Sequence, residues 1–313
     1  MIAGGGRAAA QVDAMLTQFA TVPAYYNPAA TGRTDFIHIT AGSRLQWVGI
    51  THAPMTFMAM ADMPFKFLNR RWGVGVNLRQ ESMGLYSGIN AGVQLSWKKK
   101  MLGGTLSIGI QPGIVTETFK GSKIFIPEVE GDEAHSSTDE AIPNTDVSGT
   151  AFDIAAGIMF EHKWFWTAIS STHINAPSVT LKTEGNEDNL YEFNTGRLYY
   201  FMAGSNIPIK NTLFELQPSV MVGTDFKALS LAATFKARYK KFISFGVGYR
   251  HNDAVSAMIG VDIKNFTVGY AYDYPISALS RVTHGSHELF VSYNVKLDMG
   301  PKNRNSHRSI RWM

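Results

Sequence analysis

The chain has 313 residues and a formal net charge of +4, with 45% hydrophobic and 17% charged residues, 29 glycines and no cysteine. Plentiful aromatic and β-branched residues exclude a disordered chain, the missing thiols exclude a disulfide-stapled module, and no stretch approaches the roughly 18–20 consecutive apolar residues of a transmembrane helix. The low share of charge, together with abundant glycine and aromatic residues, favours a β-barrel in a membrane.

The beginning of the chain resembles the end of an export signal. The alanines Ala8–Ala10 precede Gln11 as small residues precede a cleavage site, although the basic start and apolar stretch of a complete signal are missing. We expect a truncated signal or a flexible leader and assign residues 1–17 to it. Residues 18–33 are expected to form an N-terminal periplasmic segment or a plug.

Beyond residue 34 the dominant pattern has a period of two. From Ile89 to Trp97 apolar residues alternate with polar residues and glycine, which gives a strand one apolar and one polar face. The same alternation recurs in about 14 segments of roughly 9–12 residues, the length at which a tilted strand crosses a bilayer. These segments are expected to begin near Asp35, Pro54, Trp72, Gly88, Gly104, Gly149, Lys163, Thr195, Thr212, Ala228, Phe242, Ala254, Asn265 and Ser286. Residues 34–297 are therefore assigned to a barrel, and residues 298–313 to a basic periplasmic tail.

A soluble β-sandwich or a lipocalin-like barrel would alternate in the same way. Here the polar face is rich in Gly, Ser, Ala, Asn and Gln, which suits a crowded lumen better than an open solvent surface. Aromatic residues also gather near the segment ends, as they do in interfacial girdles. The predicted fold class is therefore all-β: a single antiparallel transmembrane β-barrel of about 14 strands, with long extracellular loops and short periplasmic turns.

The connections between segments predict an orientation. The odd-numbered connections include the two longest, Phe119–Ser148 and Asn175–Asn194, and the even-numbered ones are short. Because outer-membrane barrels have long loops outside and short turns in the periplasm, we expect an outer-membrane protein with both termini periplasmic. The short turns and the tail contribute a predicted periplasmic basic patch: Arg70, Arg71, Lys98, Lys99, Lys100, Lys240, Lys241, Arg304 and Arg308. This charge serves either topology and solubility alone or the docking of an acidic periplasmic partner.

Few residues suggest chemistry. Charged residues predicted to face the lumen are Arg79, Asp153, Glu215, Arg250, Asp262 and Glu288. Because buried charges are costly unless paired, these residues form either a network that closes the pore or the lining of a water channel. As strand residues, His284 and His287 would face opposite sides, so only a loop could bring them to one metal ion. No Gly-x-Ser-x-Gly motif and no phosphate-binding loop occur, so we expect no enzymatic activity, no metal and no cofactor.

Two groups of residues near the ends of the chain are explained neither by the alternation of the strands nor by ordinary turns. They are Gln18-Phe19, Tyr26-Asn27-Pro28-Ala29, Gly32 and Arg44-Leu45-Gln46-Trp47 at the start, and Tyr272-Asp273-Tyr274, Leu279-Ser280 and His287-Glu288-Leu289 at the end. Each motif alone is unspecific, but their order around a 14-strand pattern is specific. From Gln18 to Leu297 the chain resembles the PorP/SprF family of type IX secretion system outer-membrane proteins, found in the Bacteroidota.

The resemblance implies a non-enzymatic barrel, similar to hydrophobe transporters, that works with secretion and gliding machinery. The implied partners are the lipid bilayer, a secreted adhesin or its C-terminal sorting domain, and a periplasmic lipoprotein that holds peptidoglycan; no nucleic acid is implied. The residues that match the family motif are candidates for partner binding or for a structural role: Asn27, Pro28, Arg44, Gln46, Trp47, Tyr272, Asp273, Tyr274, His287 and Glu288. The alternative functions are an outer-membrane channel for hydrophobic or small polar solutes and a lipid hydrolase.

Overall fold

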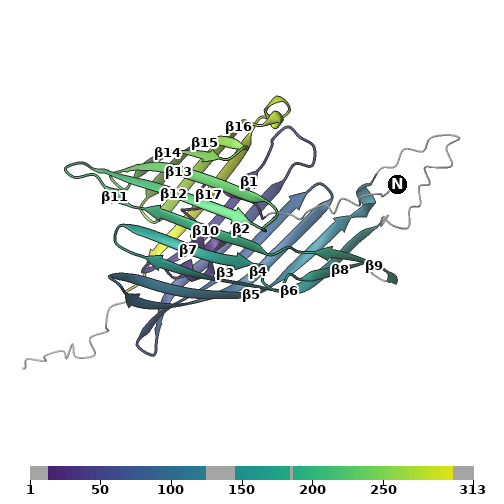
Figure 1. The fold of residues 1–313 in the computed structure, drawn as a ribbon, viewed down its shortest axis with the longest axis horizontal. Coiled ribbons are helices and arrows are strands. Elements are labelled where there is room, and N and C mark those ends of the chain that lie inside the picture. Colours follow the sequence, from purple (N-terminus) through teal and green to yellow (C-terminus); the bar gives the residue numbers. More distant parts are fainter. Residues whose placement is uncertain (1–12, 125–144, 184–185, 299–313) are drawn as a thin grey trace, which may run out of the picture.

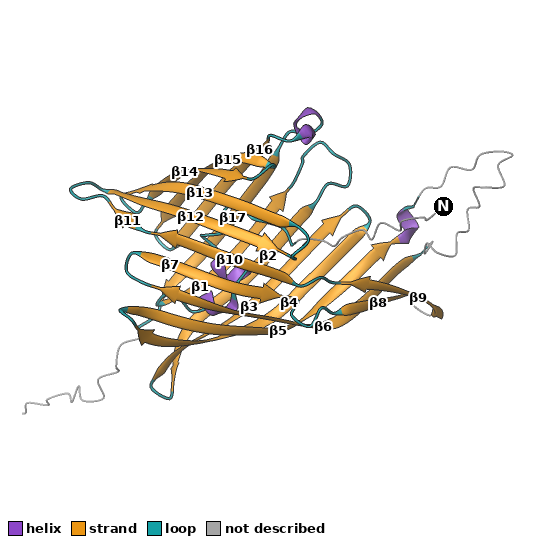
Figure 2. Ribbon diagram, in the orientation of Figure 1, coloured by secondary structure: helices purple, strands orange, loops and turns teal. Residues whose placement is uncertain are grey.

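Alternating apolar and polar residues produce one closed antiparallel barrel in the computed structural model, which describes residues 13–124, 145–183 and 186–298 (Figures 1 and 2). The fourteen wall strands are β1 (Phe36–Leu45), β2 (Met55–Phe67), β3 (Arg70–Met83), β4 (Tyr86–Met101), β5 (Gly104–Lys120), β6 (Asp146–Glu161), β7 (Phe165–Thr172), β10 (Leu198–Ser205), β12 (Phe214–Thr224), β13 (Leu229–Tyr239), β14 (Ile243–Arg250), β15 (Ala254–Ile263), β16 (Phe266–Pro275) and β17 (Ser286–Lys296). Every predicted strand start lies within three residues of an observed one, so the predicted fold class is confirmed.

The barrel closes where the first and last strands meet. β1 pairs with β2 on one side and with β17 on the other, in a register from Phe36↔Lys296 to Leu45↔His287. Because every wall strand has two neighbours, the barrel wall has no free edge. In a bilayer the backbone N–H and C=O groups of a free edge would have no hydrogen-bond partners.

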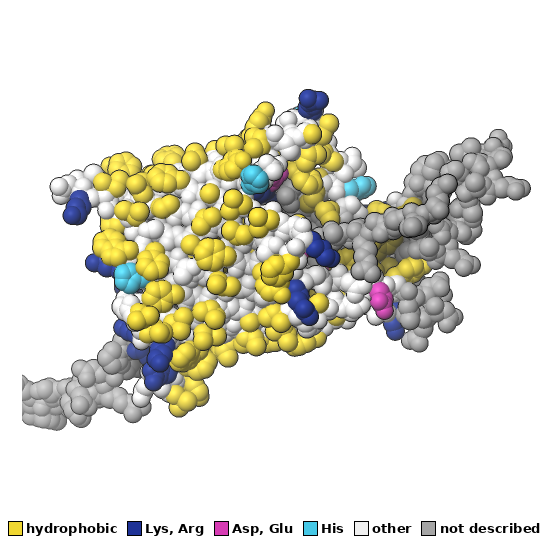
Figure 3. Space-filling model, viewed as in Figure 1, with side chains coloured by type: hydrophobic (Ala, Val, Ile, Leu, Met, Phe, Trp, Pro, Cys, Tyr) yellow, Lys and Arg dark blue, Asp and Glu magenta, His cyan; other side chains and the backbone are white. Residues whose placement is uncertain are grey.

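The outward face of the wall is apolar. The predicted outward residues Ile89, Val93 and Leu95 are between 40% and 53% exposed, and hydrophobic side chains spread over the wall in Figure 3. Such a surface fits acyl chains better than water. No helix in the described ranges is long and apolar enough to cross a membrane.

The two ends of the barrel differ. At the end that we name the short-turn end, the hairpins β2–β3, β4–β5, β6–β7, β13–β14 and β15–β16 close in two or three residues. Asn69 and Lys264 in these turns adopt left-handed φ angles of 56° and 54°. The opposite end, the long-loop end, carries the connections β5–β6, β7–β10 and β16–β17 (Figure 1). Residues 125–144 of the first of these connections lie outside the described residues.

The second long connection is not the loop that the sequence predicts. Within Asn175–Asn194 the chain forms a hairpin of β8 (Ser178–Thr183) and β9 (Asn186–Asn194), and β8 pairs with β6. The hairpin forms because Val179 and Leu181 bury their side chains against Val147 at the start of β6. A further short strand, β11 (Ile207–Pro208), extends the pairing with β12.

Residues 13–33, named the plug here, lie inside the lumen and contain two short 3-10 helices, η1 (Pro23–Tyr25) and η2 (Pro28–Ala30) (Figure 2). The main core of the molecule lies between plug and wall: Leu16, Phe19, Tyr25, Tyr26 and Ala29 pack against wall residues such as Met159, Met202, Met221 and Phe290. Residues 13–17, assigned to the leader from the sequence, therefore belong with the plug, because Met15 and Leu16 are part of this core and Asp13 and Thr17 contact wall residues.

The described chain begins and finishes toward opposite ends of the barrel. Asp13 lies near the long-loop end beside His173, which follows β7 directly. Leu297 instead donates its backbone N–H to the carbonyl of Asp35 at the short-turn end, 2.8 Å away. Residues 1–12 and 299–313 lie outside the described residues, so the placement of both termini on one side stays a prediction.

Candidate functional site

Three residues of the family motif converge inside the barrel. Arg44 pairs across the β1–β17 seam with Glu288, and β16 places Asp273 on the next strand. The Arg44 guanidinium contacts Asp273 at 2.7 Å and Glu288 at 3.1 Å, and all three side chains are at most 3% exposed. Closure of the barrel therefore joins motif residues that are more than 200 positions apart in the sequence.

These carboxylates bind the start of the plug. Glu288 accepts the backbone N–H groups of Thr17 at 2.7 Å and of Gln18 at 2.9 Å. The Thr17 hydroxyl donates to Asp273 at 2.8 Å. Arg250 on β14 donates to the Met15 carbonyl at 3.0 Å and to the Thr17 hydroxyl at 3.1 Å.

This group of five side chains is named the plug clasp: Thr17, Arg44, Arg250, Asp273 and Glu288. Its two guanidinium groups balance its two carboxylates. A buried ionic network is favourable only when each charge keeps its partners. The arrangement therefore fixes the position of the plug.

Asn27 and Pro28 anchor the other end of the plug to the wall. Asn27 caps η2 by accepting the Ala29 N–H at 2.8 Å, and Pro28 occupies the first helical position, where its missing N–H costs nothing. The Asn27 amide also donates to the carbonyls of Ile158 on β6 and Ile169 on β7, at 3.1 and 3.2 Å.

Glycines in the wall make this contact possible. A Cβ at Gly109 on β5 would lie 2.3 Å from the Ala29 nitrogen, and one at Gly157 on β6 would lie 2.3 Å from the Asn27 side-chain oxygen. Real Cβ contacts are essentially never this short. η2 therefore lies directly on the wall backbone.

A third anchor holds the first described residue of the plug. Asp13 contacts Arg79 on β3 at 2.9 Å and His173 at 3.5 Å, and the other ring nitrogen of His173 lies 3.1 Å from Asp153 on β6. Burial disfavours the charged imidazole, but hydrogen bonds and attraction from both carboxylates outweigh burial and raise the pKa of His173 to about 9. The imidazolium therefore links the plug to the wall.

Two further motif residues lie outside the clasp, in the connection after β1. The Gln46 N–H donates to the carbonyl of Pro54 at 2.9 Å. The Trp47 N–H donates to the Ser286 hydroxyl at 3.1 Å, with Trp47 in a left-handed conformation. Both residues hold the rim of the long-loop end.

The remaining motif residues, Tyr272, Tyr274 and His287, do not join the clasp either. Tyr272 donates its hydroxyl to the carbonyl of His284 at 3.0 Å, and His287 is hydrogen-bonded to the hydroxyl of Tyr270 at 2.7 Å. Tyr274 is 58% exposed. No group of three metal-ligating side chains is placed to hold an ion anywhere in the described ranges, and the two histidines belong to these rim contacts.

The residues of the predicted basic patch do not form one surface in the structure. Arg70, Arg71, Lys99 and Lys100 line a basin of about 920 Å³ at the short-turn end. Lys98, also at its edge, is buried, and its ammonium donates to the Ala29 carbonyl of the plug at 3.2 Å. Lys240 and Lys241 occupy a different turn, and Arg304 and Arg308 lie outside the described residues.

Most of the residues predicted to face the lumen hold the plug. Arg79, Asp153, Arg250 and Glu288 are buried in its anchors, whereas Asp262 pairs with Arg238 at 2.8 Å and Glu215 is half-buried on β12. Sequence reasoning missed Asp13 and Thr17, because both were assigned to the leader. No sequence pattern pairs them with strands more than 60 residues away.

Known families and solved structures include some that are similar to this chain. The profile of the family described as "Type IX secretion system membrane protein PorP/SprF" matches residues 8–293. No curated protein matches the chain. Similar solved structures include the Pseudomonas putida toluene transporter TodX (8% identity, 88% of this chain and 94% of that chain, TM-score 0.48) and a Pseudomonas aeruginosa FadL homologue (9% identity, 87% and 93%, TM-score 0.49). The CymD monoaromatic hydrocarbon channel is 11% identical over 90% of this chain and 93% of that chain, with a TM-score of 0.49.

Proposed function

The chain belongs to the PorP/SprF family of type IX secretion system membrane proteins, and from this premise we propose that it is a non-enzymatic outer-membrane component of that system and of gliding machinery. Its role is to assist the secretion or the cell-surface attachment of proteins with C-terminal sorting domains. The observation that carries the proposal is a plug fixed to the wall at three places, because a component that anchors other proteins has no need of an open pore.

The orientation belongs to the same proposal. The short-turn end faces the periplasm and the long-loop end faces the exterior, as in other outer-membrane barrels. The basin at the short-turn end then presents Arg70, Lys99 and Lys100 to the periplasm. A cluster of exposed cations attracts acidic protein surfaces over about a Debye length, so the periplasmic partner is an acidic face of a peptidoglycan-associated lipoprotein.

Cysteine labelling tests the orientation, because the natural chain has no cysteine. Lys227→Cys places a thiol in the β12–β13 turn at the long-loop end, and Asn69→Cys places one at the short-turn end; both positions are exposed. In intact cells a membrane-impermeant maleimide should label Lys227→Cys only. Labelling of Asn69→Cys alone would reverse the orientation.

Charge reversal tests the partner. The variant Arg70→Glu/Lys99→Glu/Lys100→Glu should lose co-purification of the lipoprotein and reduce secretion of a reporter that carries a sorting domain. The matched control is Lys227→Glu, which reverses an exposed charge at the opposite end. Unchanged co-purification in the triple variant would contradict docking at the basin.

A second candidate function, a channel for small polar solutes, is favoured by one observation: a cavity of about 330 Å³ remains in the lumen. Conductance in planar bilayers separates the two functions. The anchoring component should give a closed baseline, whereas a channel for polar solutes should conduct steadily.

A further inference from the structure

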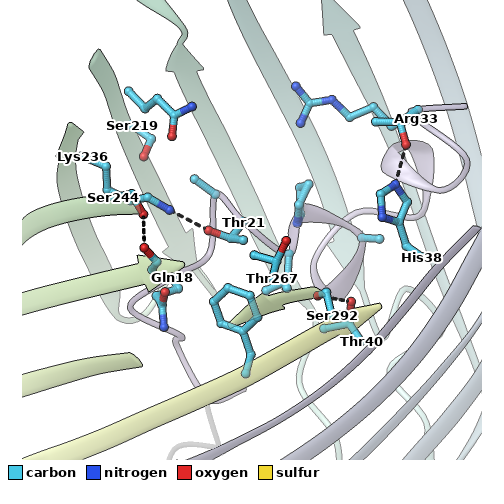
Figure 4. A pocket seen from close by; sticks show the side chains of 18 of the residues that line it. Gln18, Thr21, Arg33, His38, Thr40, Ser219, Lys236, Ser244, Thr267 and Ser292 are labelled. Carbon is cyan, nitrogen blue, oxygen red and sulfur yellow. Dashed lines mark hydrogen bonds between the residues drawn. The ribbon is translucent and has the colours of Figure 1, made fainter. Parts of the chain in front are cut away.

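The cavity occupies the short-turn half of the lumen. It lies between plug residues such as Thr21 and Arg33 and the wall residue Lys236 (Figure 4). Asp262 and Asn294 also line it, and these three wall residues are near the short-turn ends of β13, β15 and β17. The lining is rich in hydroxyl and amide groups. The side chains of Arg238 and Asp262 are about a quarter exposed, so water reaches the cavity from this end.

Glycines in the wall leave room for the polar side chains of the lining. A Cβ at Gly246 on β14 would lie 2.6 Å from Cγ of Lys236, and one at Gly260 on β15 would lie 2.6 Å from the hydroxyl of Ser244. Both side chains can therefore lie along the wall. The lumen stays hollow where larger inward residues would fill it.

Lys236 is the unusual charge of this cavity. Its ammonium donates to the Thr21 hydroxyl at 2.9 Å, and no carboxylate among the described residues lies within 4.0 Å of it. The two other long cations of the lining have such a partner: Arg33 contacts Glu161 at 2.7 Å and Arg238 contacts Asp262 at 2.8 Å. An ammonium has three donors, so two of those on Lys236 remain for a ligand.

Two more groups complete the arrangement. The Gln18 side-chain nitrogen is buried and has no hydrogen-bond partner among the described residues. Gln18 precedes Thr21 by one turn of the plug, and the Thr21 N–H donates to the Gln18 carbonyl at 2.9 Å. Asp62 on β2 lies on the far wall, where it accepts the Gly32 N–H at 2.7 Å. The cavity thus offers unused donors on one side and an anionic acceptor on the other.

We propose that this cavity binds a small hydroxylated carboxylate, with the carboxylate on Lys236 and the hydroxyl groups donating toward Asp62. The ligand carries one negative charge because one cation lacks a carboxylate. A doubly charged phosphate would meet repulsion from Asp62. A neutral sugar would leave the Lys236 ammonium without a counter-charge. The proposal does not depend on the role in secretion.

Isothermal titration calorimetry on the full chain in detergent tests this site, with gluconate as the probe and with glucose and inorganic phosphate as comparisons. Gluconate should bind saturably at one site, and Lys236→Met should weaken it by about tenfold or more, the effect of losing a hydrogen bond to a charged group. Lys240→Met removes the same charge from an exposed turn and should leave the affinity unchanged. Lys236→Gln, which keeps a donor for Thr21, serves as the second variant if Lys236→Met does not fold.

Four results would overturn the proposal. They are no binding of gluconate, equal gluconate affinity in wild type and in a folded Lys236 variant, glucose binding as tightly as gluconate, and phosphate binding as tightly as gluconate. Heat-dependent mobility on SDS gels identifies the folded variants.

Discussion

The two halves of the lumen are built from the same alternating strands, yet one is filled and the other is hollow. On β14 the inward positions near the short-turn end are Ser244 and Gly246, whereas the inward position at the long-loop end is Arg250. The long side chain reaches the plug backbone, and the small ones leave space. Alternation thus decides which residues face inward, but side-chain length and the path of the plug decide where the lumen closes.

The two halves also differ in the partners of the cations inside the lumen. In the long-loop half every cation of the plug clasp contacts a carboxylate, whereas in the short-turn half Lys236 contacts a hydroxyl. A complete buried network loses much stability when one member is removed, because the remaining charges stay buried. Removing Lys236 would leave no carboxylate without its partner, so the short-turn half is less sensitive. The comparison therefore predicts unequal responses to mutation.

The largest effect is expected for Arg44→Met in the plug clasp. Removing this guanidinium leaves Asp273 and Glu288 facing each other, so the free energy of unfolding should fall by about 3–5 kcal/mol. Urea unfolding in detergent micelles measures the change. The control is Arg281→Met in η4 (Ala278–Arg281), an exposed arginine near the same end, which should change stability by less than about 0.5 kcal/mol. Equal losses in both variants would refute the special role of the clasp.

The next effect is a pH dependence that comes from the anchor at Asp13. The pKa of His173 is about 9 in the folded protein against 6.5 unperturbed, so the imidazolium stabilises the fold. This contribution is complete below pH 6.5 and is lost as the pH rises through 9. Its size is on the order of 3 kcal/mol at most.

Unfolding at pH 6 and at pH 10 measures this loss, with His173→Gln as the comparison. The variant should be less stable than wild type at pH 6 and nearly equal to it at pH 10. Parallel pH curves for the two proteins would show that His173 does not link the plug to the wall.

The smallest effect is expected for alanine substitution of two wall glycines, one packed against the plug and one beside the cavity. Gly109→Ala drives a methyl group against the backbone of η2, so stability should fall by about 1–3 kcal/mol. Gly260→Ala meets only the hydroxyl of Ser244, which can rotate away into the cavity, so its effect should stay near zero. If Gly260→Ala were the more damaging variant, the cavity would be smaller than described.

The wall could be predicted from the sequence because each strand can be recognised from its own alternation of apolar and polar residues. Residues such as Ile89, Val93 and Leu95 face lipid at every second position, and a bilayer leaves little choice of structure for such a segment. The hairpin β8–β9 was missed because it lies beyond the wall, where Val179 and Leu181 are buried and Tyr191 and Phe193 are only partly buried against them.

The plug and the plug clasp could not be predicted from local sequence patterns. The family resemblance selected Arg44, Asp273 and Glu288 as candidates, but their meeting depends on closure of the barrel, and their contact with Thr17 depends on the path of residues 13–33. Lys98 shows the same difficulty, because its place in a basic run suggested a surface position, whereas its strand directs it inward.

Hydrogen–deuterium exchange of the plug amides tests the central claim that the plug is a fixed part of the barrel. The N–H groups of Thr17, Gln18 and Ala29 are each hydrogen-bonded to a side chain inside the lumen. They should exchange as slowly as the amides of the wall strands. Exchange as fast as that of the exposed turn at residues 251–253 would show that the plug leaves the lumen, and it would contradict the account.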